Sequence, residues 1–287
     1  MAFNLQTFKT RALTAIVFVL VMLAGLLISQ WSFLILFSVV HFGCWIEYQK
    51  LVGLIDQKYQ QIKPLHRYGI MLMGWGIMLW MTDDSYHVGS ISVAVIGWSL
   101  LWVGLIGFVL SEMLLAKKLN PKLWAYSLLG LLYISLSWGL MMRLWGNMDG
   151  IIVSSYKWML PVLLIASIWI NDTMAYVVGS FIGKTPLSPI SPKKTWEGTI
   201  GGALLAVLLV TLVGFYALAF PAKALLFISI TAAIIGTLGD LFESKLKRLA
   251  GVKDSGQIMP GHGGFLDRFD SLLFATTALW LLFHFVY

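Results

Sequence analysis

The sequence predicts an all-α, polytopic integral membrane protein. Of its 287 residues, 59% are hydrophobic and only 11% are charged, whereas charged residues make up about 25% of an ordinary soluble domain. So few charges cannot cover the surface of a soluble 32.0 kDa protein. The composition therefore excludes a soluble enzyme, a disordered tail and a disulfide-stabilised scaffold. The one cysteine, Cys44, lies in an apolar run, and we interpret it as a small buried residue.

Nine apolar runs are candidate transmembrane helices, because about 20 apolar residues cross the hydrocarbon core of a bilayer. They cover approximately residues 12–29, 31–46, 68–82, 88–111, 123–142, 158–182, 198–220, 222–241 and 271–287. The second and third runs are short and need snorkelling flanks or a locally thinner bilayer. The first run follows Lys9 and Arg11, as in a signal peptide, but no small-x-small cleavage site follows it. We therefore expect a retained first span.

The basic residues predict the orientation of these spans. With the N-terminus in the cytoplasm, 17 of the 20 Lys and Arg residues fall on the inside. The outside segments keep only Arg143, Lys157 and Lys223. Adding or removing one span would scramble this distribution, so we predict nine spans with the C-terminus outside. The net charge of +7 then indicates membrane topology and anionic lipid rather than nucleic acid.

No linker divides the chain, so we expect one continuous membrane domain with a change of composition near residue 160. Residues 1–160 form an N-terminal region of about five spans with scattered basic loops. Residues 161–287 form a C-terminal region in which acids, Gly, Ser and Lys cluster. The polar motifs of this region lie in two predicted cytoplasmic loops, 183–197 and 242–270.

The densest charge cluster, residues 240–270, contains 10 charged residues among 31. Five glycines fall within 14 residues beside them. A solvated loop is the alternative interpretation, but an ordinary linker does not need this mixture of acids, glycines and a histidine. The charged residues are Asp240, Glu243, Lys245, Lys247, Arg248, Lys253, Asp254, Asp267, Arg268 and Asp270.

Helical spacing indicates which of these side chains lie together. Asp240, Glu243 and Ser244 stand at i, i+3 and i+4, so they share one helix face. The apolar helix that reaches Asp240 is expected to continue through Arg248, with Gly251 as a C-cap.

Asp267 and Asp270 are also i, i+3, at the start of the last span. Two helix ends on the same side of the membrane can bring Asp240 and Asp267 together, and oxygen ligands of this kind suit Mg²⁺. For Asp270, the alternative is an acid favoured by the dipole at a helix N-terminus. Backbone N–H groups of residues 260–264 can approach an anion closely. His262 has neither a zinc-site spacing nor a triad partner; we expect it to line the site, and the alternative is a merely structural role.

A second cluster, residues 191–198, precedes the seventh span. Thr195 is expected to cap that helix, with Glu197 in its first turn. A helix N-terminus beside Lys193 and Lys194 is an anion site; the alternative is that the lysines only reflect the positive-inside rule. We assign Lys117, Lys118 and Lys122 to that rule.

Asp172 lies within the sixth apolar run, where an acid is costly and by default indicates function. It is expected to line a polar pocket that faces the same loops. The alternative is a buried acid paired with a nearby cation. By contrast, Asp83, Asp84 and His87 form an outside turn to which we assign no role. The residues alone thus indicate a cytoplasm-facing site for metal-assisted chemistry on a phosphate compound, with a lipid partner.

Several of these stretches resemble the CDP-diacylglycerol synthase (phosphatidate cytidylyltransferase) family. About 27 residues carry the main similarity, and its many polar positions make it specific. One departure is Met259, where the family usually has Leu, Ile or Phe, a conservative change. The similarity covers residues 165–287 well, and the earlier residues match only as membrane spans. The matching stretches are Asp172-Thr173 with Ala175-Tyr176 and Gly179, Ser191 to Gly198, Gly239-Asp240, Ser244 to Arg248, Lys253 to Gly256, and Pro260 to Asp270.

The resemblance implies that CTP and phosphatidic acid give CDP-diacylglycerol and pyrophosphate with Mg²⁺, a second metal ion being left open. The lipid phosphate attacks the α-phosphorus of CTP, so no covalent enzyme nucleophile is needed. Positioning and charge neutralisation dominate such chemistry, and a carboxylate-held metal pair can clamp the attacking and leaving oxygens. The partners expected are CTP, phosphatidic acid and the bilayer of a bacterial-type inner membrane, with the active site facing the cytoplasm. A homodimer is left open.

The same resemblance suggests residue roles, which we state as hypotheses. Asp240 and Asp267 are the main metal ligands, with Asp254 and Asp270 nearby. Lys194, Lys253 and Arg268 hold the triphosphate or the lipid phosphate. The catalytic set is Asp240, Asp267, Asp254, Lys253 and His262. The substrate-binding set is Lys193, Lys194, Ser244, Lys247, Arg248, Gly263, Gly264, Arg268 and Asp172.

Two other classes of protein are alternatives to this interpretation. A transporter would use Asp172 as an ion site, but it would show inverted repeats, which are not evident, and would not need polar motifs in two loops. Another lipid-phosphate enzyme, such as a polyprenol kinase or a CDP-alcohol phosphotransferase, is the second alternative. The paired Asp-Gly…Ala-Arg…Gly…Asp pattern of the latter is absent.

Overall fold

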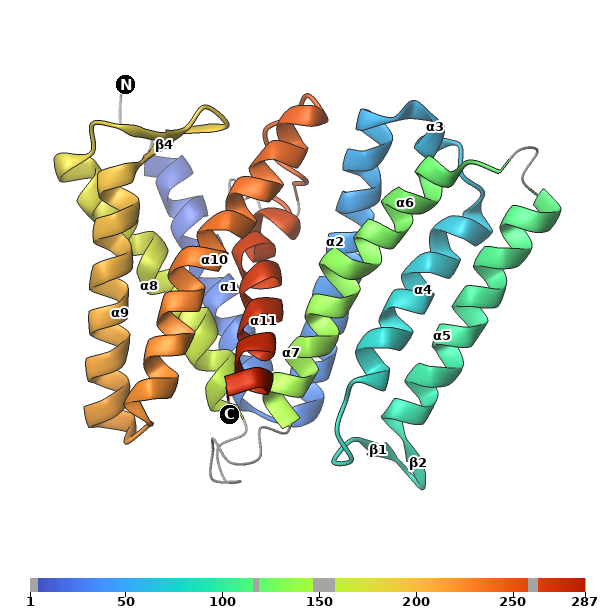
Figure 1. Cartoon of the computed structure of the whole chain (residues 1–287), viewed down its shortest axis with the longest axis horizontal. Coiled ribbons are helices and arrows are strands. Elements are labelled where there is room, and N and C mark those ends of the chain that lie inside the picture. The colour runs from blue at the N-terminus through green and yellow to red at the C-terminus, as the bar shows by residue number, and fades with distance from the viewer. Residues whose placement is uncertain (1–4, 116–118, 147–157, 258–262, 287) are drawn as a thin grey trace. The chain divides into compact units, whose positions relative to one another are not determined.

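The structure, a computed structural model, is almost entirely helical. It describes residues 5–115, 119–146, 158–257 and 263–286. Within these ranges, seven helices are long and apolar enough to cross a membrane, and a shorter apolar helix covers Ala12–Leu27. The predicted all-α, polytopic membrane fold is confirmed, with one addition. Two short antiparallel hairpins, which the sequence analysis did not predict, also form (Figure 1).

The chain divides into two compact units. Unit 1 comprises Met1–Met142 and Leu249–Arg268, and unit 2 comprises Arg143–Arg248 and Phe269–Tyr287. Each unit thus contains residues from the C-terminal motif region. The units are described separately below, and the expected continuous domain with regions 1–160 and 161–287 stays a prediction.

Unit 1 contains most of the N-terminal helices. These are α1 (Leu5–Leu27), α2 (Gln30–Ile55), the short α3 (Gln57–Gln60), α4 (Pro64–Trp80) and α5 (Val93–Leu110). Strands β1 (His87–Val88) and β2 (Ile91–Ser92) form a hairpin between α4 and α5. A π-helical segment, η1 (Ser111–Leu115), extends α5. The next long helix is built from α6 (Pro121–Gly130), the π-helical η2 (Leu131–Ser135) and α7 (Leu136–Gly146), and its residues up to Met142 belong to unit 1.

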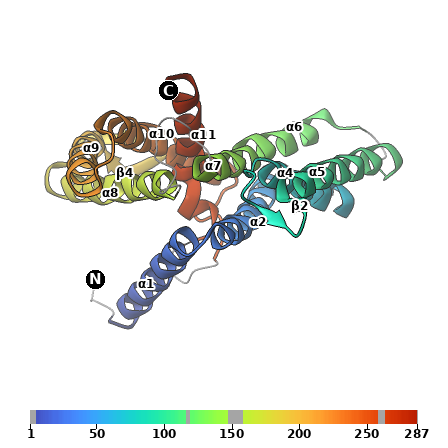
Figure 2. The same ribbon diagram turned by 90° about the horizontal axis from the view of Figure 1, so that it is seen from below.

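Glycines allow α4 and α5 to lie side by side along their length (Figures 1 and 2). A Cβ on Gly76 would lie 2.5 Å from the backbone N of Leu101. A Cβ on Gly104 would lie 2.5 Å from the backbone N of Met73. Lipid tails are as apolar as leucine, so helices in a membrane associate through such close packing rather than through a hydrophobic driving force.

One group of buried polar side chains in unit 1 forms a hydrogen-bonded network. His66 is 1% exposed; its Nδ1 lies 2.6 Å from a Glu112 carboxylate oxygen, and its Nε2 lies 2.8 Å from the Ser127 hydroxyl. The indole of Trp124 donates to the other Glu112 oxygen, and the Tyr59 hydroxyl lies 3.0 Å from Ser127. This network therefore ties α3, α4, η1 and α6 together, as buried polar groups require.

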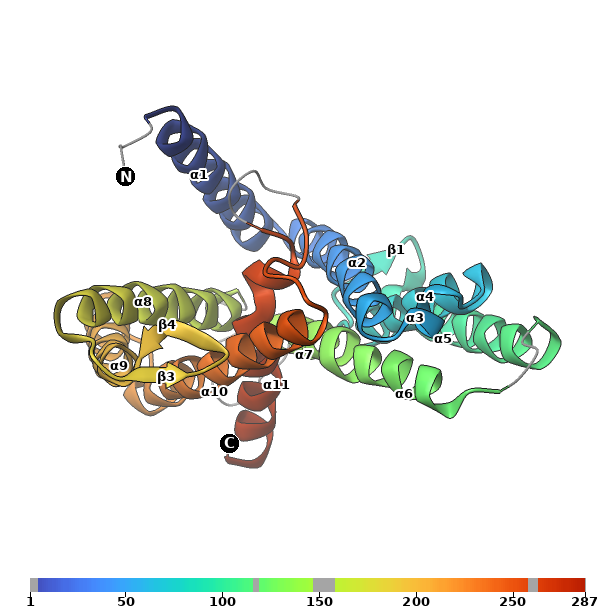
Figure 3. The same cartoon turned by 90° about the horizontal axis from the view of Figure 1, so that it is seen from above.

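Unit 2 contains α8 (Met159–Ile182), α9 (Trp196–Leu218), most of α10 (Ala222–Leu249) and most of α11 (Leu266–Val286). Strands β3 (Pro186–Ser188) and β4 (Ser191–Thr195) form the hairpin that joins α8 to α9. Figure 3 shows this hairpin lying across the ends of these two helices. Small residues again allow close approach, because a Cβ on Gly202 would lie 2.5 Å from the backbone N of Ala175.

The helix bounds refine the predicted spans. The second run, predicted as 31–46, is wrong in length, because α2 extends to Ile55 and is 26 residues long. The third run is short as predicted: α4 has 17 residues, a rise of about 25 Å. Helix α10 continues past Asp240 to Leu249, as the helical pattern predicted. Gly251 has φ +70°, the left-handed conformation expected of a C-cap glycine.

Candidate functional site

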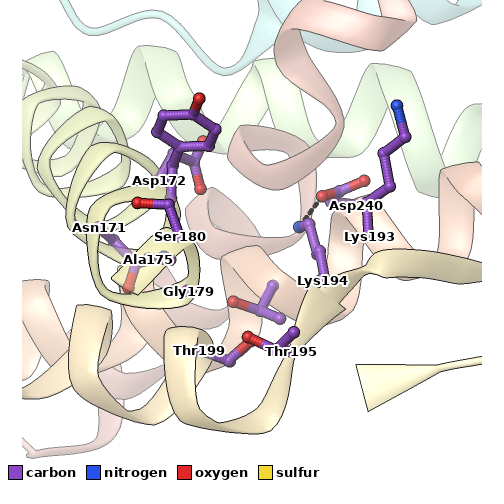
Figure 4. A pocket seen from close by; sticks show the side chains of 12 residues that line it. Asn171, Asp172, Ala175, Gly179, Ser180, Lys193, Lys194, Thr195, Thr199 and Asp240 are labelled. Atoms are coloured by element: carbon purple, nitrogen blue, oxygen red, sulfur yellow. Dashed lines mark hydrogen bonds and ion pairs between the residues drawn. The ribbon is translucent and has the colours of Figure 1, made fainter. Parts of the chain in front are cut away.

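Unit 2 holds a cavity of about 420 Å³ at the end of α8 and α9 that carries the β3–β4 hairpin (Figure 4). It combines two cationic side chains, two carboxylates and several hydroxyl and amide groups from α8, β4, α9 and α10. Asp172 was predicted to line a polar pocket, and it does line this cavity; its role in binding substrate stays a prediction. The lining residues are Asn171, Asp172, Ala175, Tyr176, Gly179, Ser180, Lys193, Lys194, Thr195, Thr199, Thr237 and Asp240.

The hairpin is held by hydrogen bonds to one carboxylate at the start of α9. Glu197 accepts bonds from the backbone N–H of Lys184 (3.1 Å) and from both the backbone N–H and the hydroxyl of Thr185. The backbone N–H of Trp196 donates to the Thr185 carbonyl at 2.9 Å. Thr195 caps α9 as predicted, because its hydroxyl accepts a bond from the Gly198 N–H at 3.1 Å. The hairpin therefore fixes β4 against the end of α9.

Strand β4 carries Lys193 and Lys194 into the pocket. The Lys194 ammonium forms an ion pair with the Asp240 carboxylate on α10 (Figure 4). The hydroxyl of Ser244, one turn further along α10, donates to the other Asp240 oxygen at 3.3 Å. The prediction that Asp240 and Ser244 share a face is therefore confirmed, and the pocket joins the second predicted cluster to the first.

The donor set of this pocket fits Mg²⁺. Asp240 pairs with the Lys194 ammonium, and Asp172 and Asn171 add hard oxygen donors to the same cavity. Among the residues that the structure describes, no group of three or more His, Cys, Asp or Glu side chains is placed to hold a metal ion. Mg²⁺ does not require one, because it is usually bound through one or two carboxylates with water and substrate phosphates completing its shell.

The other charged residues of α10 do not line this pocket. Glu243 is fully buried, and its partner is Lys247, whose side chain is 11% exposed. The ammonium of Lys247, a predicted substrate-binding residue, thus pairs with a carboxylate of its own helix. Arg248 is exposed one residue later.

In unit 1, the Asp267 carboxylate organises the Gly-rich loop. One oxygen accepts bonds from the Ser255 N–H (2.9 Å) and the Gly264 N–H (2.8 Å), and the Ser255 hydroxyl lies 2.9 Å from the same oxygen. Gly263 has φ +82°, and a Cβ there would lie 2.6 Å from that same oxygen. Both the conformation and the space therefore require glycine at position 263.

Glu47 on α2 is the residue that the sequence analysis missed. This carboxylate is 4% exposed and accepts bonds from the Ser255 hydroxyl at 2.6 Å, the Phe265 N–H at 2.9 Å and the Leu266 N–H at 2.9 Å. A Cβ on Gly264 would lie 2.2 Å from its carboxylate. Glu47 thus caps the start of α11 and anchors the loop to α2. Glu47 directly follows the predicted run 31–46, and its one signal in the sequence was an acid within the apolar stretch that forms α2.

The remaining predicted residues are placed as follows. Lys253, Asp254 and Arg268 are exposed in unit 1. Asp270 lies in unit 2, where one oxygen accepts the Ser271 N–H at 2.5 Å. His262 lies outside the described residues. Asp240 and Asp267 belong to different units, and a metal site shared between them stays a prediction.

The chain is similar to a family model and to curated proteins that all carry cytidylyltransferase descriptions. The model of the family described as the cytidylyltransferase family matches residues 9–286. A Helicobacter pylori protein named phosphatidate cytidylyltransferase is 44% identical over 128 residues, which cover 42% of this chain and 48% of that protein. A Bacillus subtilis protein of the same name is 51% identical over 117 residues, or 40% of this chain and 44% of that protein.

A third relative with this name, from Synechocystis, is 45% identical over 138 residues, which cover 45% of this chain and 43% of that protein. The chain thus spans less than half the length of each of these curated relatives. The family model, by contrast, extends over almost the whole sequence. On that match, the chain belongs to the cytidylyltransferase family.

Proposed function

We propose that the protein is a CTP:phosphatidate cytidylyltransferase of phospholipid biosynthesis. It makes CDP-diacylglycerol and pyrophosphate from CTP and phosphatidic acid. Membership of the family and the shared name of the relatives support this activity. The observation that carries the proposal is the pocket that Lys193, Lys194, Asp172 and Asp240 line at one end of membrane-spanning helices, with Lys194 paired to Asp240.

The reaction needs the combination of charges that this pocket provides. An oxygen of the lipid phosphate attacks the α-phosphorus of CTP, the bond from that phosphorus to the bridging oxygen of the β-phosphate breaks, and pyrophosphate leaves. Both reactants are anions, so their approach requires positive charge. Lys194 and Lys193 would bind phosphate oxygens and neutralise part of that charge. An Asp240 partner keeps the Lys194 ammonium on the cavity wall before substrate arrives.

Mg²⁺ is the proposed cofactor, and a second metal ion is part of the same proposal. Asp240 would hold it, with Asp172 or Asn171 completing the protein's oxygen donors. When bound, the ion supplies further positive charge for the phosphate oxygens. Asp267, Asp254 and Asp270 stay proposed ligands, and Lys253, Arg268, Ser244, Lys247, Arg248, Gly263, Gly264 and His262 keep the roles proposed for them.

An activity assay tests this proposal. Full-length protein in detergent is given CTP, phosphatidate and Mg²⁺, and CDP-diacylglycerol and pyrophosphate are measured. Asp240→Asn is expected to reduce kcat by about 10²-fold or more, the scale seen when a charge-stabilising group is removed. Asp84→Asn, an exposed acid of the turn before β1, is the matched control and should keep near wild-type turnover. Near wild-type turnover of both Asp240→Ala and Asp267→Ala would show that the metal assignment is wrong.

The products discriminate between related activities. Pyrophosphate release identifies a cytidylyltransferase, whereas CMP release indicates a CDP-alcohol phosphotransferase and a nucleoside diphosphate indicates a lipid kinase. Release of none of these, with Asp172-dependent ion flux, would favour a transporter instead.

We also propose that α1 and α4 cross the membrane together with the seven longer helices, giving nine spans with the N-terminus inside and the C-terminus outside. The distribution of basic residues supports this orientation. The membrane would be the inner membrane of a bacterium, with the β3–β4 pocket open to the cytoplasm, where CTP is available.

A further inference from the structure

A second cavity, of about 460 Å³, lies in unit 1 between the end of α2 and the start of α4. It shares no lining residue with the pocket of unit 2. Two cations, Lys50 on α2 and Arg67 on α4, line it. Neither of them forms an ion pair with a carboxylate within the described part of the chain.

The Arg67 guanidinium makes one hydrogen bond but leaves a buried donor without a partner within the described ranges. One terminal nitrogen donates to the Gln60 carbonyl at 3.4 Å, and the Gln49 side chain donates to the Arg67 carbonyl at 3.1 Å. Arg67 Nε is buried without a hydrogen-bond partner among the described residues. A buried donor on a permanent cation is costly to leave unpaired, so this geometry favours an anion as its partner.

Apolar side chains line the part of the cavity that lies beyond both cations, away from the helix ends. Ile46 is one helical turn before Lys50, and Met71 is one turn after Arg67. Because α2 runs toward this end of unit 1 and α4 runs away from it, both apolar residues lie about 6 Å further from the helix ends than the cations. Ile46 is 60% exposed and Tyr68, also in the lining, is 63% exposed.

This order of groups has the polarity of a phospholipid. Cations near the helix ends lie at headgroup depth, and the apolar residues lie at the depth of the upper acyl chain. A tyrosine, which has an apolar ring and a polar hydroxyl, is typical of the boundary between the two. A free phosphate would use the cations but not the apolar wall.

We propose that this cavity binds one acidic phospholipid of the surrounding leaflet. The lipid phosphate pairs with Lys50 and the Arg67 guanidinium, and an acyl chain packs against Ile46, Tyr68 and Met71. The site is separate from the proposed reaction pocket, and binding there does not depend on the proposed catalytic activity.

Lipid binding to full-length protein in detergent tests the proposal, with native mass spectrometry counting bound phosphatidylglycerol against phosphatidylcholine. The double substitution Lys50→Gln/Arg67→Gln is expected to weaken phosphatidylglycerol binding by about tenfold or more, because it removes both cations that pair with the lipid phosphate. The control is Lys58→Gln/Lys63→Gln, which removes the same charge at the same end of these helices from exposed positions outside the cavity lining. It should change binding by less than about twofold.

Three results would overturn the proposal. One is unchanged phosphatidylglycerol binding by the Lys50→Gln/Arg67→Gln protein. Another is an equal loss in the Lys58→Gln/Lys63→Gln protein, which would indicate general surface charge. The third is tight binding of glycerol 3-phosphate that depends on Arg67, which would identify a site for a free phosphate. Lys50→Gln alone changes only an exposed side chain, so a smaller but measurable loss in this variant is required even if the double variant does not fold.

Discussion

At the scale of single residues, Glu47 has the most demanding environment. Its carboxylate is surrounded by a hydroxyl and two backbone N–H groups, all of which donate to it. The Ser255 hydroxyl also lies 2.9 Å from Asp267. One hydroxyl proton can serve only one acceptor at a time, so Ser255 links the two carboxylates and makes the position of Asp267 depend on α2.

Glu47→Gln should therefore loosen the loop that precedes α11. The amide keeps the volume but turns one acceptor into a donor that faces other donors, which costs about 1–3 kcal/mol of unfolding free energy for the unsatisfied groups. Hydrogen exchange is expected to be faster at the amides of Phe265 and Leu266 than in wild type. Unchanged exchange at both amides would contradict the anchoring role; Asp84→Asn provides the control for an exposed acid.

Lys194 connects the hairpin to α10, and its substitution tests substrate binding. Lys194→Met removes a charge from the pocket wall and leaves Asp240 without its cation. We expect kcat/KM for CTP to fall by about 10²-fold, since hydrogen bonds to charged groups contribute about 1.5–3 kcal/mol each. Lys184→Met, an exposed lysine that does not line the pocket, should remain near wild type. Equal kinetics for the two variants would remove Lys194 from the site.

At the scale of elements, glycine contacts decide how the helices pair. Gly104 and Gly107 lie one turn apart on α5, but only Gly104 faces α4 closely. A Cβ at position 104 would meet Met73 backbone at 2.5 Å, whereas at position 107 its nearest neighbour would be a Leu65 methyl carbon at 3.5 Å. The two glycines form a matched pair in which helix propensity is equal and packing differs.

Gly104→Ala is accordingly expected to destabilise the protein and Gly107→Ala is not. Alanine favours a helix over glycine by about 1 kcal/mol at either position, but overpacking at 104 costs about 1–3 kcal/mol. Thermal unfolding in detergent should show a lower Tm for Gly104→Ala and an equal or higher Tm for Gly107→Ala. The same Tm for both proteins would mean that α4 and α5 are free to separate slightly.

At the scale of the whole molecule, the proposed topology places the β1–β2 hairpin outside and the β3–β4 hairpin inside. Cys44 is buried in α2, so Cys44→Ala gives a background for new single cysteines. In intact cells, a membrane-impermeant maleimide should label Ser90→Cys, and it should label Lys184→Cys only after permeabilisation. Labelling of both positions from outside would show that the number of spans between them is wrong.

Composition and charge distribution determine the class of protein without reference to tertiary structure. A chain with 11% charged residues can fold only where lipid covers its apolar surface, and the helical period made Asp240 and Ser244 neighbours. Local patterns also predicted the Thr195 cap, the continuation of α10 and the left-handed Gly251. Each of these depends on contacts within a few residues, which a sequence displays directly.

Contacts between distant segments were decided by tertiary structure alone. Glu47 and Ser255 are 208 residues apart, and nothing in either local pattern indicates the other. The pairing of Lys194 with Asp240 and the hairpin that presents it likewise depend on how α8, α9 and α10 pack. The sequence alone determined a membrane protein whose polar motifs lie in its C-terminal region, for which phosphate binding stays a proposal. Only the packed structure decided which carboxylate holds which cation, because helix packing brings together charges that the chain order keeps apart.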